Sequence, residues 1–366
     1  MAAPVQPDMR KVEFIKLLTA IRARRATYSF RCVQAMLKSA GMPSASGWAP
    51  LIAKFNELNY ADPKTDWDFY HQTILSMHNA SIHAGTTAIW MFKAPKADIA
   101  QMLPHLIGTL DKNSLFATQF PYPITEEELA RQSFSTTPVA TAVIEKGRTA
   151  IVSCGKRAYR EREQLEPETI DEAFKAHLGT FQELIVVRSG FTQAYDRLVI
   201  DTLSDRLEIH IDLCCPLNTE ELQQMQEAYV KRIKEPMEKA LRRKLPWLNN
   251  PINFYPCIAN LYKAKDGAIQ LLGHVTSTKS VKIERMRNQH LDLREELFHK
   301  KGRAAVNGTD AFSIKKGWPT ARGNVPSVLI PGHSGLAGAI GAAVRHAVVE
   351  NCATTEDFDT VISHLT

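Results

Sequence analysis

The sequence predicts an α+β fold, with an N-terminal basic helical unit followed by a mixed, largely antiparallel body of hairpins and helices. Pairs of apolar runs flank short polar turns, which is typical of hairpins and therefore of antiparallel strands. Helical segments lie between these pairs without a regular βαβ rhythm. The 366 residues exceed the usual size of one domain. We expect units at 1–62, 63–216 and 217–366, or the last two joined as one.

Three short helices are expected in the first unit, because apolar residues recur there at helical spacing. The three sets are Phe14, Leu17, Leu18 and Ile21; Val33, Met36 and Leu37; and Leu51, Phe55 and Leu58. The polar faces carry Arg22, Arg24 and Arg25. Three packed helices with a tight turn are found in helix-turn-helix proteins that bind DNA. The alternative is a plain bundle with a solvated basic face.

In the body, three hairpins are predicted after a strand at Thr86–Phe92 and a helix at Ile99–Leu110. The paired runs are Val139–Ile144 with Thr149–Cys154, Leu198–Thr202 with Leu207–Leu213, and Ile258–Lys263 with Ala268–Val275. Asp266-Gly267, in the third pair, is the strongest turn signal in the chain.

Later helices are predicted from their end signals. Asn218 and Glu221 form a capping box that begins a long helix, which Pro236 should kink or end early. A strand ends near Ile283, and a short helix should begin at Asp292 and end at Gly302. The segment 327–344 reads as a strand, a turn and a glycine-rich helix.

Positive charge is concentrated in separate segments. Residues 1–60 hold nine Lys and Arg against three Asp and Glu, and residues 277–323 hold eleven against five. Each segment therefore has a net charge of +6, equal to that of the whole chain. A third basic run lies at 231–244. Basic segments on an otherwise acidic chain indicate a surface for phosphates.

The second basic segment supplies most of the candidate binding residues. Helix capping accounts for part of its charge, but several cations have no such role. Together with the three N-terminal arginines, the candidate nucleic-acid contacts here are Lys282, Arg285, Arg287, Arg303, Lys315, Lys316, Trp318 and Arg322. Basic loops with one aromatic residue suit phosphate contact and stacking on a base. The alternative is a solvated rim, with Trp318 in the core.

Glu208, His210 and Asp212 alternate with apolar residues and so share one face of a strand. Carboxylates and an imidazole that converge in this way can hold a divalent metal and activate water. The alternative, which we favour, is the polar outer face of a half-solvated sheet. No metal ligand and no catalytic residue is therefore assigned.

Several classes of protein are disfavoured. The chain lacks a Walker lysine and dinucleotide-binding spacing, and Ser334 lies in an incomplete nucleophile-elbow pattern, so no cofactor is expected. The six cysteines lack C-x-x-C spacing, which favours reduced thiols. The longest uncharged run is interrupted by prolines and glycines, so no membrane association is expected. Without a signal-peptide pattern, we expect a cytoplasmic protein.

Three functions remain open. The favoured one is a nucleic-acid-binding protein, for DNA or RNA, without catalytic activity of its own. The second is a metal-dependent hydrolase or nuclease that uses Glu208, His210 and Asp212. The third is an interaction subunit of a larger assembly, with a protein partner or a second copy of itself.

Overall fold

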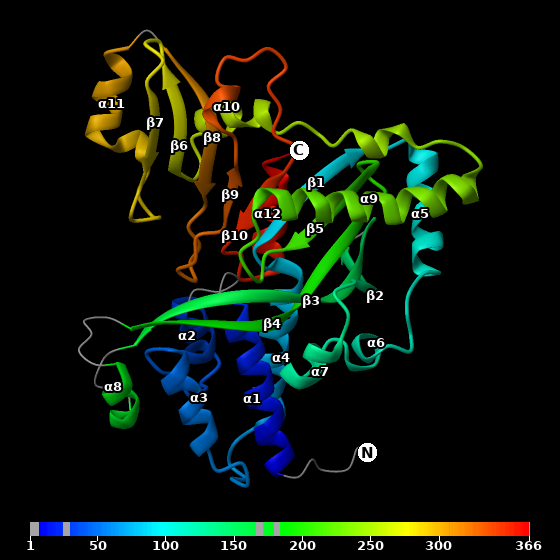
Figure 1. Ribbon diagram of the computed structural model, residues 1–366, viewed down its shortest axis with the longest axis vertical. Coiled ribbons are helices and arrows are strands. Elements are labelled where there is room, and N and C mark those ends of the chain that lie inside the picture. The colour runs from blue at the N-terminus through cyan, green and yellow to red at the C-terminus, as the bar shows by residue number, and fades with distance from the viewer. Residues whose placement is uncertain are drawn as a thin grey trace.

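The computed structural model describes residues 7–24, 30–145, 147–165, 171–178, 184–306 and 308–365, and they form the predicted α+β fold (Figure 1). The strands are β1 (Thr87–Lys93), β2 (Thr137–Glu145), β3 (Arg148–Leu165), β4 (Leu184–Asp201), β5 (Arg206–Asp212), β6 (Ala268–Thr276), β7 (Val281–Arg285), β8 (Thr309–Gly317), β9 (Ser327–Ile330) and β10 (Ala347–Glu350). The α-helices are α1 (Pro7–Ala23), α2 (Phe30–Ser39), α3 (Trp48–Glu57), α4 (Trp67–Ala84), α5 (Lys96–Ile107), α6 (Leu115–Gln119), α7 (Glu126–Arg131), α8 (Glu172–Leu178), α9 (Thr219–Leu241), α10 (Tyr255–Lys263), α11 (Leu297–Ala304) and α12 (Thr355–Ser363). Short 3-10 helices are η2 (Pro246–Asn249), η3 (Leu293–Glu295) and η4 (Ser334–Leu336).

Within the described ranges, ten strands form one antiparallel sheet in the order β2-β3-β4-β5-β1-β10-β9-β8-β6-β7. Its two halves meet where β1 pairs with β10, with Thr87 opposite Val349 and Ala88 opposite Val348. The sheet therefore takes strands from both of the ranges 63–216 and 217–366. β2 and β7 are its edge strands.

Helices cover both faces of the central strands. The apolar stripe of α9, including Tyr229 and Ile233, packs with Ile209 and Ile211 of β5. On the other face, α10 and α12 pack with β1, β6, β8, β9 and β10. Because both faces are covered, every residue of β5 is buried. Its polar side chains are consequently not on a half-solvated face.

The first three helices pack against α4. Their shared core contains Phe14, Leu18 and Phe55 together with Trp67 and Ile74 of α4. Apolar contact between these helices stabilises the N-terminal unit, and its three predicted helices are all present. The core of this unit thus includes residues beyond position 62.

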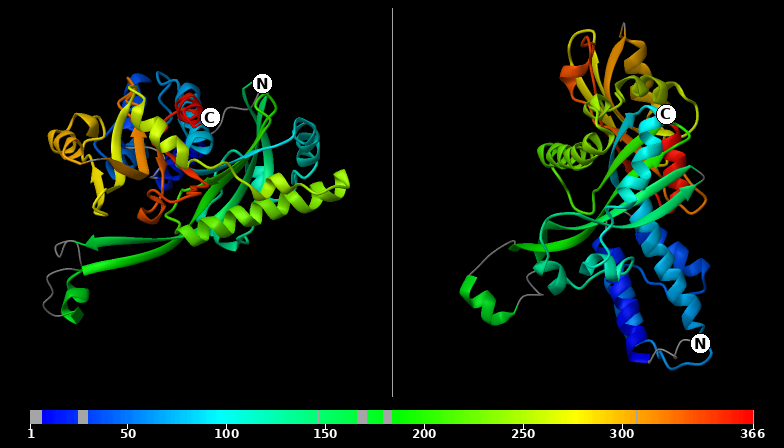
Figure 2. Two further views of the ribbon diagram at one scale, coloured as in Figure 1. Left: turned by 90° about the horizontal axis from the view of Figure 1, so that it is seen from above. Right: turned by 90° about the vertical axis from the view of Figure 1, so that its right-hand side faces the viewer.

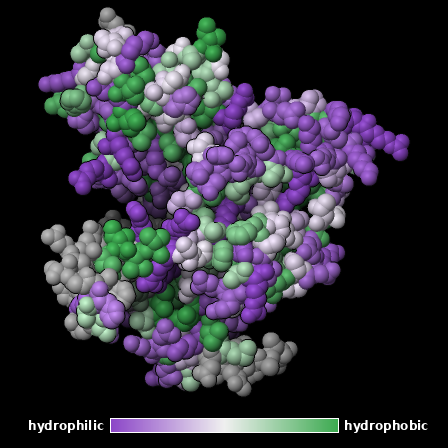
Figure 3. Space-filling view, viewed as in Figure 1, coloured by the Kyte–Doolittle hydropathy of each residue, from purple (hydrophilic) through white to green (hydrophobic). Residues whose placement is uncertain are grey.

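A long ribbon of β3 and β4 leaves the body of the molecule, with α8 near its tip (Figure 2). Ile185 and Val187 on its outer part are 48% and 53% exposed. Figure 3 shows hydrophobic side chains gathered over this part of the ribbon.

The first two predicted hairpins are confirmed as β2–β3 and β4–β5. The third is wrong, because residues 255–263 form α10. Pro256 is in the first turn of that helix, where proline is favourable, and Ile258 and Leu261 are buried at helical spacing. Asp266-Gly267 therefore connects a helix to a strand.

Of the other predicted helix starts and ends, some are confirmed and some are wrong. The capping box of Asn218 and Glu221 is confirmed. Pro236 does not end α9, which continues to Leu241, and Gly302 lies inside α11. The predicted glycine-rich helix is absent from residues 334–344, which the structure describes. Gly338 and Gly341 there have φ of +68° and +74°, values that a right-handed helix does not allow.

Candidate nucleic-acid interface

One of the two edges of the described sheet lies at β7. This strand pairs with β6 on one side, with His274 opposite Lys282 and Leu271 opposite Arg285. Its other side has no neighbouring strand in the described sheet. Because side chains alternate along a strand, Lys282 and Arg285 leave opposite faces of β7. Both are exposed.

The acidic side chains around β7 are already engaged within the protein. Glu284 lies 2.7 Å from His274 Nε2 and 3.0 Å from His299 Nδ1. These hydrogen bonds outweigh the effect of partial burial and lower the pKa of Glu284. Asp292 pairs with Arg294 at 2.6 Å.

The two acids that follow are engaged as well. Glu295 pairs with Lys300 at 2.6 Å, and Glu296 accepts a hydrogen bond from the His299 backbone N–H, which caps α11. The four carboxylates between residues 277 and 303 are therefore held by cations, histidines or the start of a helix. They are poorly placed to neutralise the remaining basic side chains.

Five exposed cations remain without an acidic partner among the described residues. We call them the basic edge: Lys279, Lys282, Arg285, Arg287 and Lys301. Exposed apolar side chains lie among them, including Ile283 at 67% and Phe298 at 78% exposure. Figure 3 shows hydrophilic and hydrophobic side chains side by side over this part of the molecule.

Two predicted contacts beside the basic edge are occupied by internal interactions. The Arg303 guanidinium lies over the Tyr262 ring, 4.6 Å from its centre. Trp318 stacks on His364 with ring centres 4.2 Å apart, and its Nε1–H donates to Asp266 at 2.7 Å. Trp318 is therefore poorly placed to stack on a base.

The basic residues of β8 and the following loop also act within the fold. Lys315 forms an ion pair with Glu350. Lys316 is fully buried, where its Nζ donates to the carbonyls of Leu261 and Ala264. Burial lowers the pKa of this ammonium group.

Arg322 approaches Asp357 of α12 at 3.2 Å, so its guanidinium also has an internal partner. In contrast to the expectation, Lys316 is not on the surface. Lys315 and Arg322 have acidic partners, so we leave all three out of the interface.

The N-terminal arginines do not add to the basic edge. Arg22 is half-buried in the last turn of α1. Arg24 is buried and donates to Asp212 at 2.6 Å and to the Ser81 carbonyl at 2.8 Å, so it is not on the surface as expected. Arg25 lies outside the described residues. In Figures 1 and 2, α1 to α3 lie at the opposite end of the molecule from β7 and α11.

Glu208 and His210 lie in a buried network and not on the solvated face that we favoured. They are 0% and 1% exposed, and Glu208 Oε2 lies 2.7 Å from His210 Nε2. Glu208 also pairs with Arg206 at 2.6 Å. Burial opposes ionisation of Glu208, but the His210 hydrogen bond and the Arg206 and Arg148 charges lower its pKa to about 2. α12 covers the network, since Phe358 lies 5.5 Å from the His210 ring.

Asp212, the third residue of that strand face, belongs to another set of contacts. Its carboxylate accepts hydrogen bonds from Arg24 and from the Tyr195 backbone N–H at 2.8 Å. Among the residues that the structure describes, no three His, Cys, Asp or Glu side chains are grouped to hold a metal ion. The geometry therefore does not favour the metal-dependent alternative.

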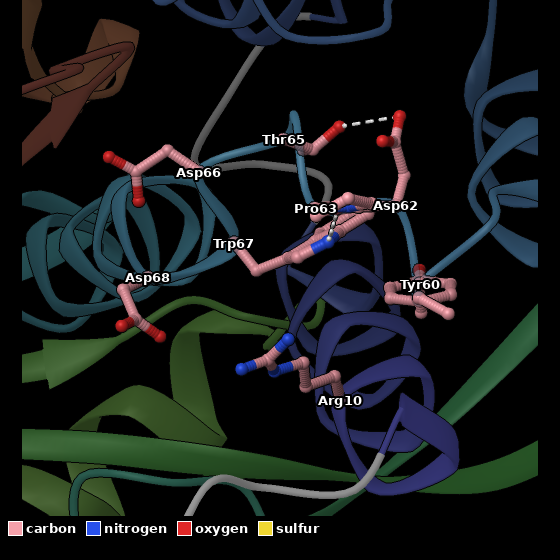
Figure 4. Close-up of a pocket in the computed structure, with 9 residues that line it drawn as sticks. Arg10, Tyr60, Asp62, Pro63, Thr65, Asp66, Trp67 and Asp68 are labelled. Atoms are coloured by element: carbon pink, nitrogen blue, oxygen red, sulfur yellow. Dashed lines mark hydrogen bonds between the residues drawn. The ribbon is translucent and has the colours of Figure 1, made fainter.

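A further pocket, of about 440 Å³, lies where α1 approaches the start of α4 (Figure 4). Two of its three acidic groups have structural roles. Asp62 accepts from Thr65 and from the Lys64 backbone N–H, and Asp66 caps α4 by accepting from the Phe69 N–H. These contacts explain the acidic turn without a ligand.

The sequence matches no family model and no curated protein. Of the described helices, none is both long and apolar enough to cross a membrane. Of the six cysteines, the five whose side chains the structure describes are free thiols, and four of these are buried.

Proposed function

We propose that this protein binds nucleic acid, without catalytic activity of its own, through the basic edge. The observation that supports this function is the excess of unpaired positive charge around β7. Five exposed cations lack an acidic partner in the described structure, while the four neighbouring carboxylates are held internally. A polyanion can supply the missing partners without displacing any internal ion pair.

The two kinds of side chain in this surface have separate roles in the proposal. Lys and Arg contact phosphates, and arginine adds paired hydrogen bonds to phosphate oxygens. Phe298 and Ile283 offer apolar surface to bases or sugars, and an exposed aromatic ring stacks on any base. Such a surface binds with little sequence preference.

The direct test is fluorescence anisotropy with labelled single-stranded and double-stranded DNA and RNA over a salt series. Because each phosphate contact releases a counterion, we expect log affinity for duplex DNA to fall with log salt at a slope of roughly −4 to −5. Undetectable binding at about 50 mM salt, or an affinity that does not depend on the salt concentration, would contradict the proposal.

A second measurement separates nucleic acid from an acidic protein partner. Polyglutamate carries regular negative charge but no phosphate or base. We expect it to compete weakly against a labelled oligonucleotide, since it cannot form the paired phosphate contacts or the stacking contacts. Competition as strong as that of an unlabelled oligonucleotide would favour an interaction subunit instead.

A further inference from the structure

The edge strand β7 carries exposed side chains on both of its faces. α11 packs on one face, where His299 Nδ1 lies 3.0 Å from the Glu284 carboxylate. Lys282 leaves from this same face, because side chains alternate along a strand. Ile283 and Arg285 leave from the opposite face. A ligand that contacts all of the exposed side chains must therefore pass over the edge of the sheet.

Each face combines exposed apolar surface with positive charge. At the start of α11, Leu297 and Phe298 are 62% and 78% exposed, and Lys301 lies one turn further along the same side of the helix. On the opposite face of β7, Val281 and Ile283 are 51% and 67% exposed. Apolar side chains that are gathered in this way on a surface are typical of a binding site.

A double helix would leave much of this apolar surface uncovered. Its outer surface presents phosphates, and its bases are stacked inside, so Phe298 would have no base face to stack on. A duplex is also stiff over roughly 50 nm and does not fold around one edge strand of a sheet. Long Lys and Arg side chains can reach its phosphates, but the apolar groups on both faces of β7 cannot reach its bases.

A nucleic-acid single strand has neither limitation. Its backbone is flexible, and its bases are free to stack on aromatic side chains. It can pass over the edge of β7 with its phosphates on the basic edge. One base then meets Phe298 on the α11 side, and another meets Ile283 on the opposite face.

We propose that the basic edge binds single-stranded nucleic acid in preference to duplex. The single strand passes over β7, Phe298 stacks on one base, and Ile283 packs against another. The inference rests on the proposed function, since it names the form of nucleic acid that the same surface takes. Binding of duplex through phosphate contacts alone is weaker.

The test compares single strands of about 20 nucleotides with the DNA duplex of the same sequence, by fluorescence anisotropy at one salt concentration. DNA and RNA forms of the single strand show which sugar is preferred. We expect the tighter of the two to bind at least about tenfold more strongly than the duplex. Equal or tighter binding of the duplex would overturn this inference and leave nucleic-acid binding intact, whereas no binding of any probe would reject both.

Phe298→Ala shows whether the preference comes from this surface. Loss of one stacking contact should lower single-strand affinity by roughly five- to hundredfold and change duplex affinity by less than about twofold. The salt slope should stay the same, because no phosphate contact is lost. Phe298→Tyr keeps an aromatic ring and should bind both probes as the parent does.

Phe69→Ala is the matched control for this variant. Phe69 is also exposed and near the start of a helix, α4, but the first turns of α4 pack with α1 to α3, remote from β7 (Figure 1). We expect its single-strand affinity to equal that of the parent. The same loss in both alanine variants, or no loss in either, would refute the inference.

Ile283→Thr tests the second face of β7. Threonine keeps the branched side chain that favours a strand and removes apolar surface. Single-strand affinity should fall roughly three- to tenfold. The melting temperature should be nearly unchanged, because Ile283 is exposed. Unchanged single-strand affinity would mean that the nucleic acid stays on one face, and would contradict its passage over the edge.

Discussion

At the scale of single residues, the polar side chains of β5 act as internal partners. Glu208, His210 and Asp212 all lie under packed helices, and each has a fixed hydrogen-bond or ion-pair partner. Alternation of polar and apolar residues along a strand is normally associated with a sheet that is exposed to solvent on one face. Here the second face is covered by α12, whose position depends on residues far along the chain.

The burial of His210 gives a first prediction. His210→Ala should lower the free energy of unfolding by about 1 to 3 kcal/mol, because it removes a buried partner of Glu208. His290→Ala is the matched control, since His290 is exposed and its change should stay within about 0.5 kcal/mol. Urea unfolding measures both. Equal effects would mean that His210 is not buried in solution.

Stability should also depend on pH through the buried histidines. Burial lowers the pKa of His78 and of His210 from 6.5 to about 4. Between these values the unfolded chain is protonated at both residues, whereas the folded chain is not. This contribution to stability is therefore complete above pH 6.5 and is lost as the pH falls toward 4.

Each histidine changes the free energy of unfolding by up to roughly 1.4 kcal/mol per pH unit in that window. Urea unfolding at about pH 7 and about pH 5 should show a loss of roughly 2 to 4 kcal/mol. His210→Gln should reduce the loss, because it removes one titrating group. A loss that is the same in this variant would exclude His210 as a contributor.

At the scale of elements, two glycines lie in contrasting environments: one is inside a helix, and the other is packed closely against backbone. Gly302 lies inside α11 with open space around its Cα, so Gly302→Ala should raise stability by about 0.5 to 1 kcal/mol. At Gly332, an added Cβ would clash with the Phe312 carbonyl oxygen, so Gly332→Ala should destabilise the fold strongly. Thermal unfolding measures both, and destabilisation by Gly302→Ala would restore the prediction that this glycine ends the helix.

Local signals predicted elements well where neighbouring residues decide the structure. The β2–β3 and β4–β5 hairpins and the start of α9 depend on turns and a capping box within a few residues. Residues 258–263 were misassigned because short apolar runs suit both strands and helices. The i, i+3 spacing of Ile258 and Leu261 and the proline at 256 were the available signals for α10.

The candidate sites were harder to predict from the sequence than the helices and strands, because they depend more on contacts between residues far apart in the chain. The sequence predicted Lys282, Arg285 and Arg287, whose exposure follows from a free strand edge. It did not separate them from Lys316 or Arg24, whose partners are remote in the chain. A Lys or Arg paired with a residue some two hundred positions away has the same local pattern as a free one.

At the scale of the whole molecule, the N-terminal helices are joined to the rest by core and charge contacts. A truncated protein that begins near Asp66 would expose Trp67 and Ile74, and would leave buried Asp212 without Arg24. Loss of a buried partner alone costs about 3 to 5 kcal/mol. From this packing we expect the truncated protein to aggregate. Gel filtration decides, and a monomeric folded fragment would contradict this expectation.

The basic segments are also distributed over the whole molecule and do not form one surface. The run 231–244 lies on and just after α9, and the N-terminal helices are remote from β7 (Figures 1 and 2). Binding through the basic edge should therefore be sensitive to position and not only to net charge. This distinction can be measured with two variants of equal charge.

The most direct measurement compares two double variants. One carries Arg285→Glu and Arg287→Glu in the basic edge, and the other carries Lys231→Glu and Lys239→Glu on the exposed face of α9. Both change the net charge equally. In anisotropy titrations, we expect the first to weaken nucleic-acid binding strongly and to make the salt slope shallower by roughly 1.8 for duplex DNA, with a nearly unchanged melting temperature. The α9 variant should bind almost as the parent does. Equal affinity of both variants would contradict the assignment of the basic edge as the nucleic-acid interface.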